Sequence, residues 1–300
     1  MQTAESLAGS HQTLPAAMAI VFNALVWGVS WWPLRELQAH GLHPLWATAL
    51  MYLMIVTVVL ALRFRAIDGF IAHPQLWLLG AAAGFTNVGF NWAVTVGDVV
   101  RVVLLFYLMP AWSVIVAWVM LGQRPTAGSL LRLVLAMAGV LVVLKAPDSP
   151  WPIPQGAADW LALMGGLGFA VTNALLYKFG HTPSASRMLA MFGGSGLMAA
   201  LVAGVGMTQQ AIPAPSMALA GVPVLLGLSL AFMASNSALQ FGAARLAVGT
   251  TAILMLTEIL FASVSSALMG AAELSPRVLA GGSLIVLAAV LAAVASARGR

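Results

Sequence analysis

Long apolar runs alternate with short polar or proline-bearing stretches along nearly the whole chain. The runs are continuous and lack the apolar–polar alternation of strands in a membrane barrel, so they predict helices. About 20 helical residues cross the roughly 30 Å hydrocarbon core of a bilayer. Ten runs are about that long: residues 15–34, 45–62, 75–96, 99–121, 127–144, 159–179, 184–207, 217–241, 247–270 and 277–297.

The two halves of the chain resemble each other. Shifts of 149 or 150 residues bring polar and aromatic positions into register: Asn87 with Asn236, Asn91 with Gln240, Asn23 with Asn173, and Trp27 with Tyr177. A repeat of five spans is odd in number, so consecutive copies enter the membrane from opposite sides. The predicted fold is therefore an all-α integral membrane protein, with ten transmembrane helices as two inverted-topology five-helix repeats around a central cavity.

The punctuation between the runs predicts the division of the chain. We expect a polar cytoplasmic N-terminus, a first repeat with helices 1–5, a periplasmic linker rich in proline, a second repeat with helices 6–10, and a short cytoplasmic C-terminus. These segments are residues 1–14, 15–146, 147–157, 158–297 and 298–300.

Composition agrees with a membrane protein. The chain is 61% hydrophobic and 7% charged, with a mean hydropathy of +0.99, whereas a soluble domain is roughly a quarter charged. These values argue against a soluble enzyme and against disorder. The absence of cysteine from the sequence excludes disulfides, zinc–thiolate sites and thiol catalysis.

The net charge of +5 is best interpreted by where the basic residues fall. With the N-terminus inside, nine of the 13 Lys and Arg residues lie on the cytoplasmic side and four on the other side. The positive-inside rule then places both termini in the cytoplasm. The charge marks topology, and we expect no nucleic-acid partner.

Three short motifs resemble the drug/metabolite transporter superfamily, in its ten-helix EamA-type branch. They are Trp27-Gly28-Val29-Ser30-Trp31, Tyr107-Leu108-Met109-Pro110, and Leu256-Thr257-Glu258-Ile259. The chain is most similar to bacterial aromatic amino acid exporters. It departs from the family pattern at Ile259, where proline is usual, and at Gln123, where glutamate is usual.

The resemblance and the repeat together imply a secondary transporter of the bacterial inner membrane. It would export or equilibrate small metabolites, foremost amino acids with aromatic or other bulky apolar side chains, by alternating access at a midplane cavity. The expected partners are a small-molecule substrate and the lipid bilayer. No cofactor and no metal are implied, and the sequence leaves the oligomeric state open.

Polar side chains inside membrane spans are costly and usually face protein or water. The candidate substrate-binding residues are Asn23, Trp27, Asn87, Asn91, Tyr107, Asn173, Tyr177, Asn236 and Gln240. Amides supply donors for a carboxylate and acceptors for an ammonium group, and aromatic rings offer a flat apolar surface. The alternative is that the amides join helices, at about 0.6 kcal/mol each.

Two further residues are candidates for a part in transport. Glu258 is the one acid near the middle of a span, and it could couple a proton or contact a substrate ammonium group. Pro110 lies inside the fourth span and cannot donate to the carbonyl of Phe106, which favours a kink and a gate.

Four other functions compete with an amino acid carrier. One is a multidrug carrier with broad amphiphilic substrates, and another is a channel, which would need a continuous polar pore. Gly193-Gly194-Ser195-Gly196 matches the motif of intramembrane serine proteases, but no histidine lies mid-span to act as its base. A structural protein would not need the duplicated amides.

Overall fold

A computed structural model describes the chain at residues 2–96, 99–145, 154–270 and 275–298, with side chains at 13–93, 102–145, 154–270 and 275–297. In these ranges the chain is helical and contains no strand. The first half forms α1 (Gln2–Val29), α2 (Trp31–Ala39), α3 (Pro44–Leu62), α4 (Ala66–Ala72), α5 (Gln75–Val96), α6 (Val99–Phe106), α7 (Met109–Leu121) and α8 (Ala127–Leu144). The second half forms α9 (Ala157–Lys178), α10 (Ser184–Thr208), the 3-10 turn η1 (Leu219–Gly221), α11 (Val222–Ala243), α12 (Val248–Met255), α13 (Thr257–Leu268) and α14 (Pro276–Arg298).

These helices group into the ten expected spans. Four spans combine two elements: α1 with α2, α6 with α7, η1 with α11, and α12 with α13. Nine spans within the described ranges are long and apolar enough to cross a membrane. The tenth is α5, which has 22 residues but is not among the nine; it carries Asn87 and Asn91.

Most span boundaries lie within a few residues of those expected, but the first span is longer at both ends, and α2 continues it to Ala39 instead of residue 34. Helix α1 begins at Gln2, so the polar N-terminal stretch continues the first span as helix. Most of the expected linker (147–153) and the last two residues of the expected C-terminus (299–300) lie outside the described ranges.

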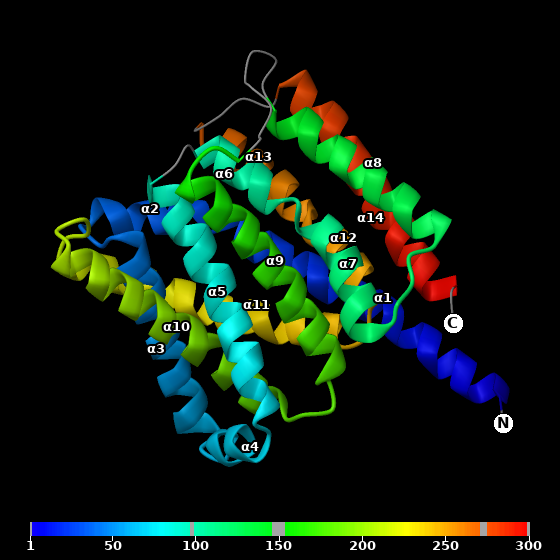
Figure 1. Cartoon of the computed structure of the whole chain (residues 1–300), viewed down its shortest axis with the longest axis horizontal. Helices are drawn as coiled ribbons and strands as arrows, with labels where there is room; N and C mark the ends of the chain where they lie inside the picture. The colour runs from blue at the N-terminus through cyan, green and yellow to red at the C-terminus, as the bar shows by residue number, and fades with distance from the viewer. Residues whose placement is uncertain (1, 97–98, 146–153, 271–274, 299–300) are drawn as a thin grey trace.

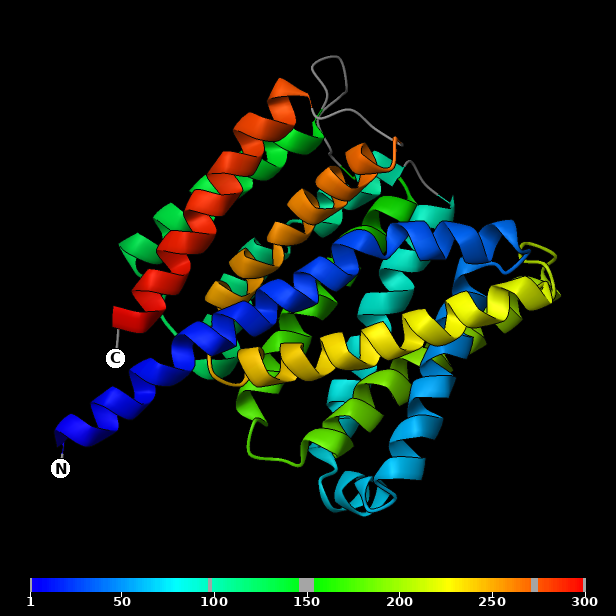
Figure 2. The ribbon, with the colours of Figure 1, turned by 180° about the vertical axis from the view of Figure 1, so that it is seen from behind.

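Both ends of the chain lie at one end of the bundle, which we call the terminal face (Figure 1). The opposite end, where α8 ends and α9 begins, is the linker face. Helices α8 and α14 pair along one edge of the bundle, and α3 and α10 pair along another (Figures 1 and 2). Each pair joins equivalent spans of the two halves, as a twofold relation between inverted repeats requires.

Glycine allows the closest helix crossings. A Cβ on Gly139 would lie 2.7 Å from the carbonyl oxygen of Gly281, and a Cβ on Gly281 would lie 2.6 Å from that of Gly139. Helices α8 and α14 therefore touch through their backbones, as small residues permit in membranes. Gly80 of α5 likewise faces Ala190 and Gly194 of α10, which supports the expected packing role of the Gly193–Gly196 stretch.

The helix breaks are the clearest sign of the repeat. The fourth span is interrupted at residues 107–108, between α6 and α7, and the ninth at Leu256, between α12 and α13. Position 107 shifted by 149 is position 256, the same shift that aligns the amides. Broken helices at matching places in two halves point to a binding site between them.

Candidate functional site

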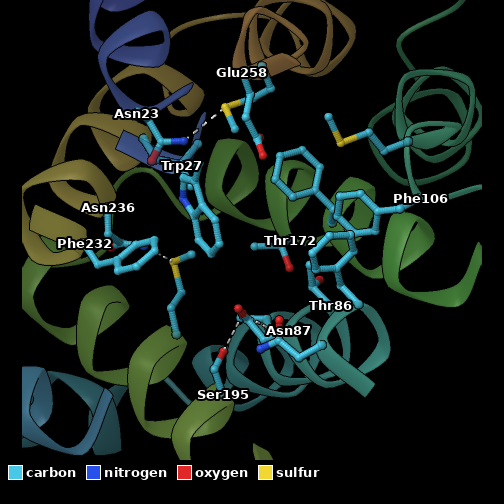
Figure 3. A pocket seen from close by; sticks show the side chains of 18 of the residues that line it. Asn23, Trp27, Thr86, Asn87, Phe106, Thr172, Ser195, Phe232, Asn236 and Glu258 are labelled. Atoms are coloured by element: carbon cyan, nitrogen blue, oxygen red, sulfur yellow. Dashed lines mark hydrogen bonds between the residues drawn. The ribbon is translucent and has the colours of Figure 1, made fainter. Parts of the chain in front are cut away.

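A cavity lies in the middle of the bundle, next to both helix breaks (Figure 3). It contains about 100 Å³ of space for the centres of water-sized molecules, enough for several waters. Side chains from α1, α3, α5, α9, α10 and α11 line it, together with Phe106, Tyr107 and Met109 at the first break and Met255 and Glu258 at the second. Helices α8 and α14 take no part.

The cavity brings together many of the residues expected to bind substrate. Those that line it are Asn23, Trp27, Asn87, Asn91, Tyr107 and Asn236, together with Glu258. Asn173 and Gln240 are instead buried away from the cavity wall. Tyr177 and Pro110 line a separate groove on the terminal face.

The two amides of α5 are held by neighbouring helices. Asn87 accepts a hydrogen bond from the Tyr52 hydroxyl (2.8 Å) and donates to the carbonyl of Ala83 (2.9 Å) and to the Ser195 hydroxyl (3.1 Å). Asn91 donates to the Thr48 hydroxyl at 2.8 Å. These bonds tie α5 to α3 and α10, so the amides join helices as well as line the cavity.

The amides of α1 and α11 are also engaged. Asn23 accepts from the Ser235 hydroxyl (2.6 Å) and donates to the sulfur of Met255 (3.1 Å). Asn236 accepts from the Gln240 amide (2.7 Å) and lies 3.5 Å from the sulfur of Met191. The cavity wall is therefore largely fixed by its own hydrogen bonds.

A buried arginine continues this network toward the terminal face. Arg187, in the first turn of α10, donates from Nε to the Gln240 side chain at 3.1 Å. Its Nη1 donates to the carbonyls of Phe179 (3.1 Å), Gly180 (2.9 Å) and Thr182 in the α9–α10 connection. Arg187 is one of the nine basic residues counted on the cytoplasmic side, but its side chain is only 6% exposed. The Arg187 guanidinium therefore links the α9–α10 connection to Gln240 of α11.

Glu258 is the single acid among the lining residues, and no Lys, Arg or His lines the cavity. Glu258 is the second residue of α13, and its side chain is partly exposed. The Tyr107 hydroxyl is the polar neighbour of its carboxyl group. Each of these two residues lies at one of the two helix breaks. The cavity thus has one acidic point where the two repeats meet.

Aromatic side chains cover much of the remaining wall. Phe106 packs against Phe90 (4.6 Å between ring centres) and Phe169 (6.3 Å), and Trp27 packs against Phe232 (4.5 Å). Most of these rings were missed in the sequence, where a phenylalanine in an apolar span has no distinguishing mark. Phe232 is the exception that could have been found, because it precedes Asn236 by one helical turn.

Ser195, the serine of the protease-like motif, accepts a hydrogen bond from Asn87 and faces the cavity (Figure 3). None of the lining residues is a histidine, so this wall supplies no imidazole to activate the hydroxyl.

An apolar cluster closes the terminal side of the cavity. We call this cluster the terminal plug. It consists of Val116 and Ala117 of α7, Ala170 and Ala174 of α9, and Val248 of α12. Within the described part of the chain, no comparable packing joins α6 to α13 on the linker side. On the linker side of the described chain, α13 packs against α1 and α6 packs against α9 instead, so the two broken spans pack extensively on each other only at the terminal side.

The helices of the terminal plug also contain buried polar atoms without a protein partner. They are the side-chain donors or acceptors of Trp112, Ser113, Thr172, Asn173 and Thr251. Asn173 is 1% exposed with both amide atoms unpaired, whereas Asn23, its counterpart in the first repeat, has two partners. Equivalent positions in the two repeats therefore have different surroundings.

Comparison with known proteins fits this geometry. Residues 14–145 match the model of the EamA-like transporter family. The match covers the first repeat, which is less than half of the chain. Members of this family are membrane transporters of small molecules. The match agrees with the family resemblance of the two motifs in the first repeat, and the resemblance to aromatic amino acid exporters stays a prediction.

The chain also shares its fold with solved structures. One, titled "Crystal structure of protein", superposes with a TM-score of 0.77 at 17% identity, covering 94% of this chain and 98% of that one. At this identity the likeness shows the fold alone, and it includes both repeats. None of the curated proteins compared matches the chain.

Proposed function

We propose that the transporter is a secondary carrier that moves small organic molecules by alternating access. Amino acids with aromatic or other bulky apolar side chains are the first substrate class, and broader amphiphilic compounds are the alternative. The observation that carries the proposal is the central cavity at two matching helix breaks, lined by amides and aromatic rings and with one carboxyl group.

The unequal closure of the two sides supports alternating access. The terminal plug closes one side by apolar packing, and its helices contain unpaired polar atoms. Leaving such an atom buried without a partner costs about 1–3 kcal/mol. Separation of α7, α9 and α12 would hydrate these atoms, which offsets part of the cost of opening the terminal side. Inverted repeats make the reverse closure at the linker side available.

We place Glu258 at the amine end of the substrate. A positively charged amine would find in Glu258 the one acidic group of the cavity wall, with aromatic rings around it. If both termini lie in the cytoplasm of a bacterial cell, as proposed, the terminal face is cytoplasmic and the linker face is periplasmic, and a cavity closed at the terminal side would be accessible from the periplasm. This orientation would suit release of an exported substrate.

Transport into proteoliposomes tests the proposal. A panel of labelled aromatic amino acids and amphiphilic amines should give saturable uptake that is accelerated by substrate on the opposite side. Asn91→Ala and Asn236→Ala should reduce uptake several-fold, and Glu258→Gln should abolish it for amines. Ser283→Ala is the matched control, since Ser283 is exposed on α14 and bonds only to its own helix at Leu279.

Other outcomes would contradict particular parts of the proposal. Flux that rises linearly with concentration would indicate a channel. Saturable transport of other compounds but of no amino acid would support a carrier and would contradict amino acids as the substrate class. Unchanged amine transport by Glu258→Gln would remove the contact assigned to Glu258.

A further inference from the structure

A second and larger cavity opens on the terminal face, separate from the central one. We call it the basic groove. It contains about 390 Å³ of space for the centres of water-sized molecules and lies between α7, α8, α9, α12 and α14. The charged residues in its wall are Arg124 and Arg132, and no Asp, Glu or His lines it.

Within the described ranges, no acidic residue or hydrogen-bond acceptor neutralises the two arginines of the basic groove. Neither Arg124 nor Arg132 forms a hydrogen bond or an ion pair with another described residue. Arg187 differs from them, because backbone and side-chain oxygens occupy its guanidinium. Two guanidinium groups are thus exposed to one cavity with their donors unused.

The position of Arg132 concentrates this positive charge. Its side chain turns back toward the start of α8, and its Nη1 lies 3.5 Å from where a Cβ of Gly128 would be. The start of a helix carries a partial positive charge and disfavours a cation. Arg132 therefore lies where the helix start disfavours its charge, and it shares the groove wall with Arg124, which precedes the helix by three residues. An anion between them would offset that unfavourable charge.

The groove wall also contains uncharged polar side chains. Thr126 and Ser129 bond to each other's backbone and hold the first turn of α8 rigid, and the Tyr177 side chain lines the opposite wall. Guanidinium groups match phosphate oxygens through paired N–H bonds. Arg124 lies in the connection between two spans, at the depth where lipid headgroups meet water.

We infer that the basic groove binds a phosphate-bearing anion, held by Arg124 and Arg132. The phosphate could belong to an anionic lipid headgroup or to a free anion. Because the groove also touches Thr250 of α12, its occupant would bridge α8 to the helices of the terminal plug.

Binding to the purified full-length protein in detergent tests the inference without any transport measurement. Short-chain phosphatidylglycerol should raise the Tm of the wild type, and an equal amount of phosphatidylcholine should not. The double variant Arg124→Gln/Arg132→Gln should bind at least about tenfold more weakly, because both charged hydrogen-bond donors to the phosphate are lost. Arg63→Gln/Arg65→Gln is the matched control, with the same charge change on exposed arginines outside the groove.

Inorganic phosphate as a second probe distinguishes the sources. An equal shift with phosphate alone, lost in the groove variant, indicates a free anion. A shift with the lipid only indicates a headgroup. The inference is overturned if neither probe binds, or if both double variants lose binding equally, because surface charge alone would then account for the effect. If the protein transports no substrate but still binds the lipid, the proposed carrier function is contradicted and the inference about the basic groove is supported.

Discussion

At the scale of single residues, Gly28 explains why glycine follows Trp27 in the first motif. A Cβ on Gly28 would lie 2.6 Å from the carbonyl oxygen of Glu258 and 2.7 Å from the Cβ of Phe261. The missing side chain therefore lets α1 reach the backbone of α13 at the residue that supplies the cavity's carboxyl group. The Trp27-Gly28 motif of α1 therefore helps to fix the position of the Glu258 backbone.

Gly28→Ala should consequently destabilise the protein. Overpacking typically costs about 1–3 kcal/mol, and here the clash meets backbone that cannot rotate away. Thermal unfolding in detergent should show a lower Tm, with reduced transport. Gly227→Ala is the control, since nothing lies within 4 Å of a Cβ there, and alanine favours the helix. Equal Tm values for both variants would contradict the close approach.

At the scale of elements, the break between α6 and α7 shapes the cavity. Pro110, near the start of α7, has no N–H for the carbonyl of Phe106, and that oxygen instead lies 2.7 Å from where a Cβ of Gly166 would be. The interruption lets Phe106, Tyr107 and Met109 all face the cavity. A continuous helix would carry these neighbours to different faces.

Pro110→Ala should restore the N–H and favour a continuous helix. The Phe106 and Tyr107 side chains would then leave their places in the cavity wall, and the rate of substrate uptake should fall several-fold while the protein still folds. Pro215→Ala, in the exposed connection before η1, should transport normally. Wild-type uptake by Pro110→Ala would mean that the break does not depend on the proline.

The elements were largely predictable from the sequence, and the site only in part. Hydrophobic runs and prolines mark span ends, because each span must satisfy its backbone internally. The spacing of the amides indicated shared helix faces. It could not show that Asn173 points between helices or that Gln240 bonds to Arg187, because both depend on packing across distant segments.

The burial of Arg187 was beyond sequence reasoning for a similar reason. Its partners are backbone carbonyls at Phe179, Gly180 and Thr182, and those are available only in the turn that the α9–α10 connection adopts. A count of basic residues treats every such arginine as solvated.

At the scale of the whole molecule, orientation follows from where the two faces lie. The sequence contains no cysteine, so single cysteines can report exposure. Gln209→Cys lies at the linker face and Arg65→Cys at the terminal face, and both positions are exposed. A membrane-impermeant thiol reagent should label Gln209→Cys in intact cells, and Arg65→Cys only after permeabilisation. The opposite pattern would place both termini outside.

The modest hydropathy of α5 has a consequence for biogenesis. This helix carries Asn87 and Asn91, which cost free energy when the nascent segment leaves the translocon for lipid. Its principal packing partners, α9 and α10, belong to the second repeat and are synthesised later. The third span is therefore expected to insert stably only after the second repeat has been synthesised and has buried its amides. Although residues 14–145 match a family model by themselves, we expect the first repeat to be stable only together with the second repeat.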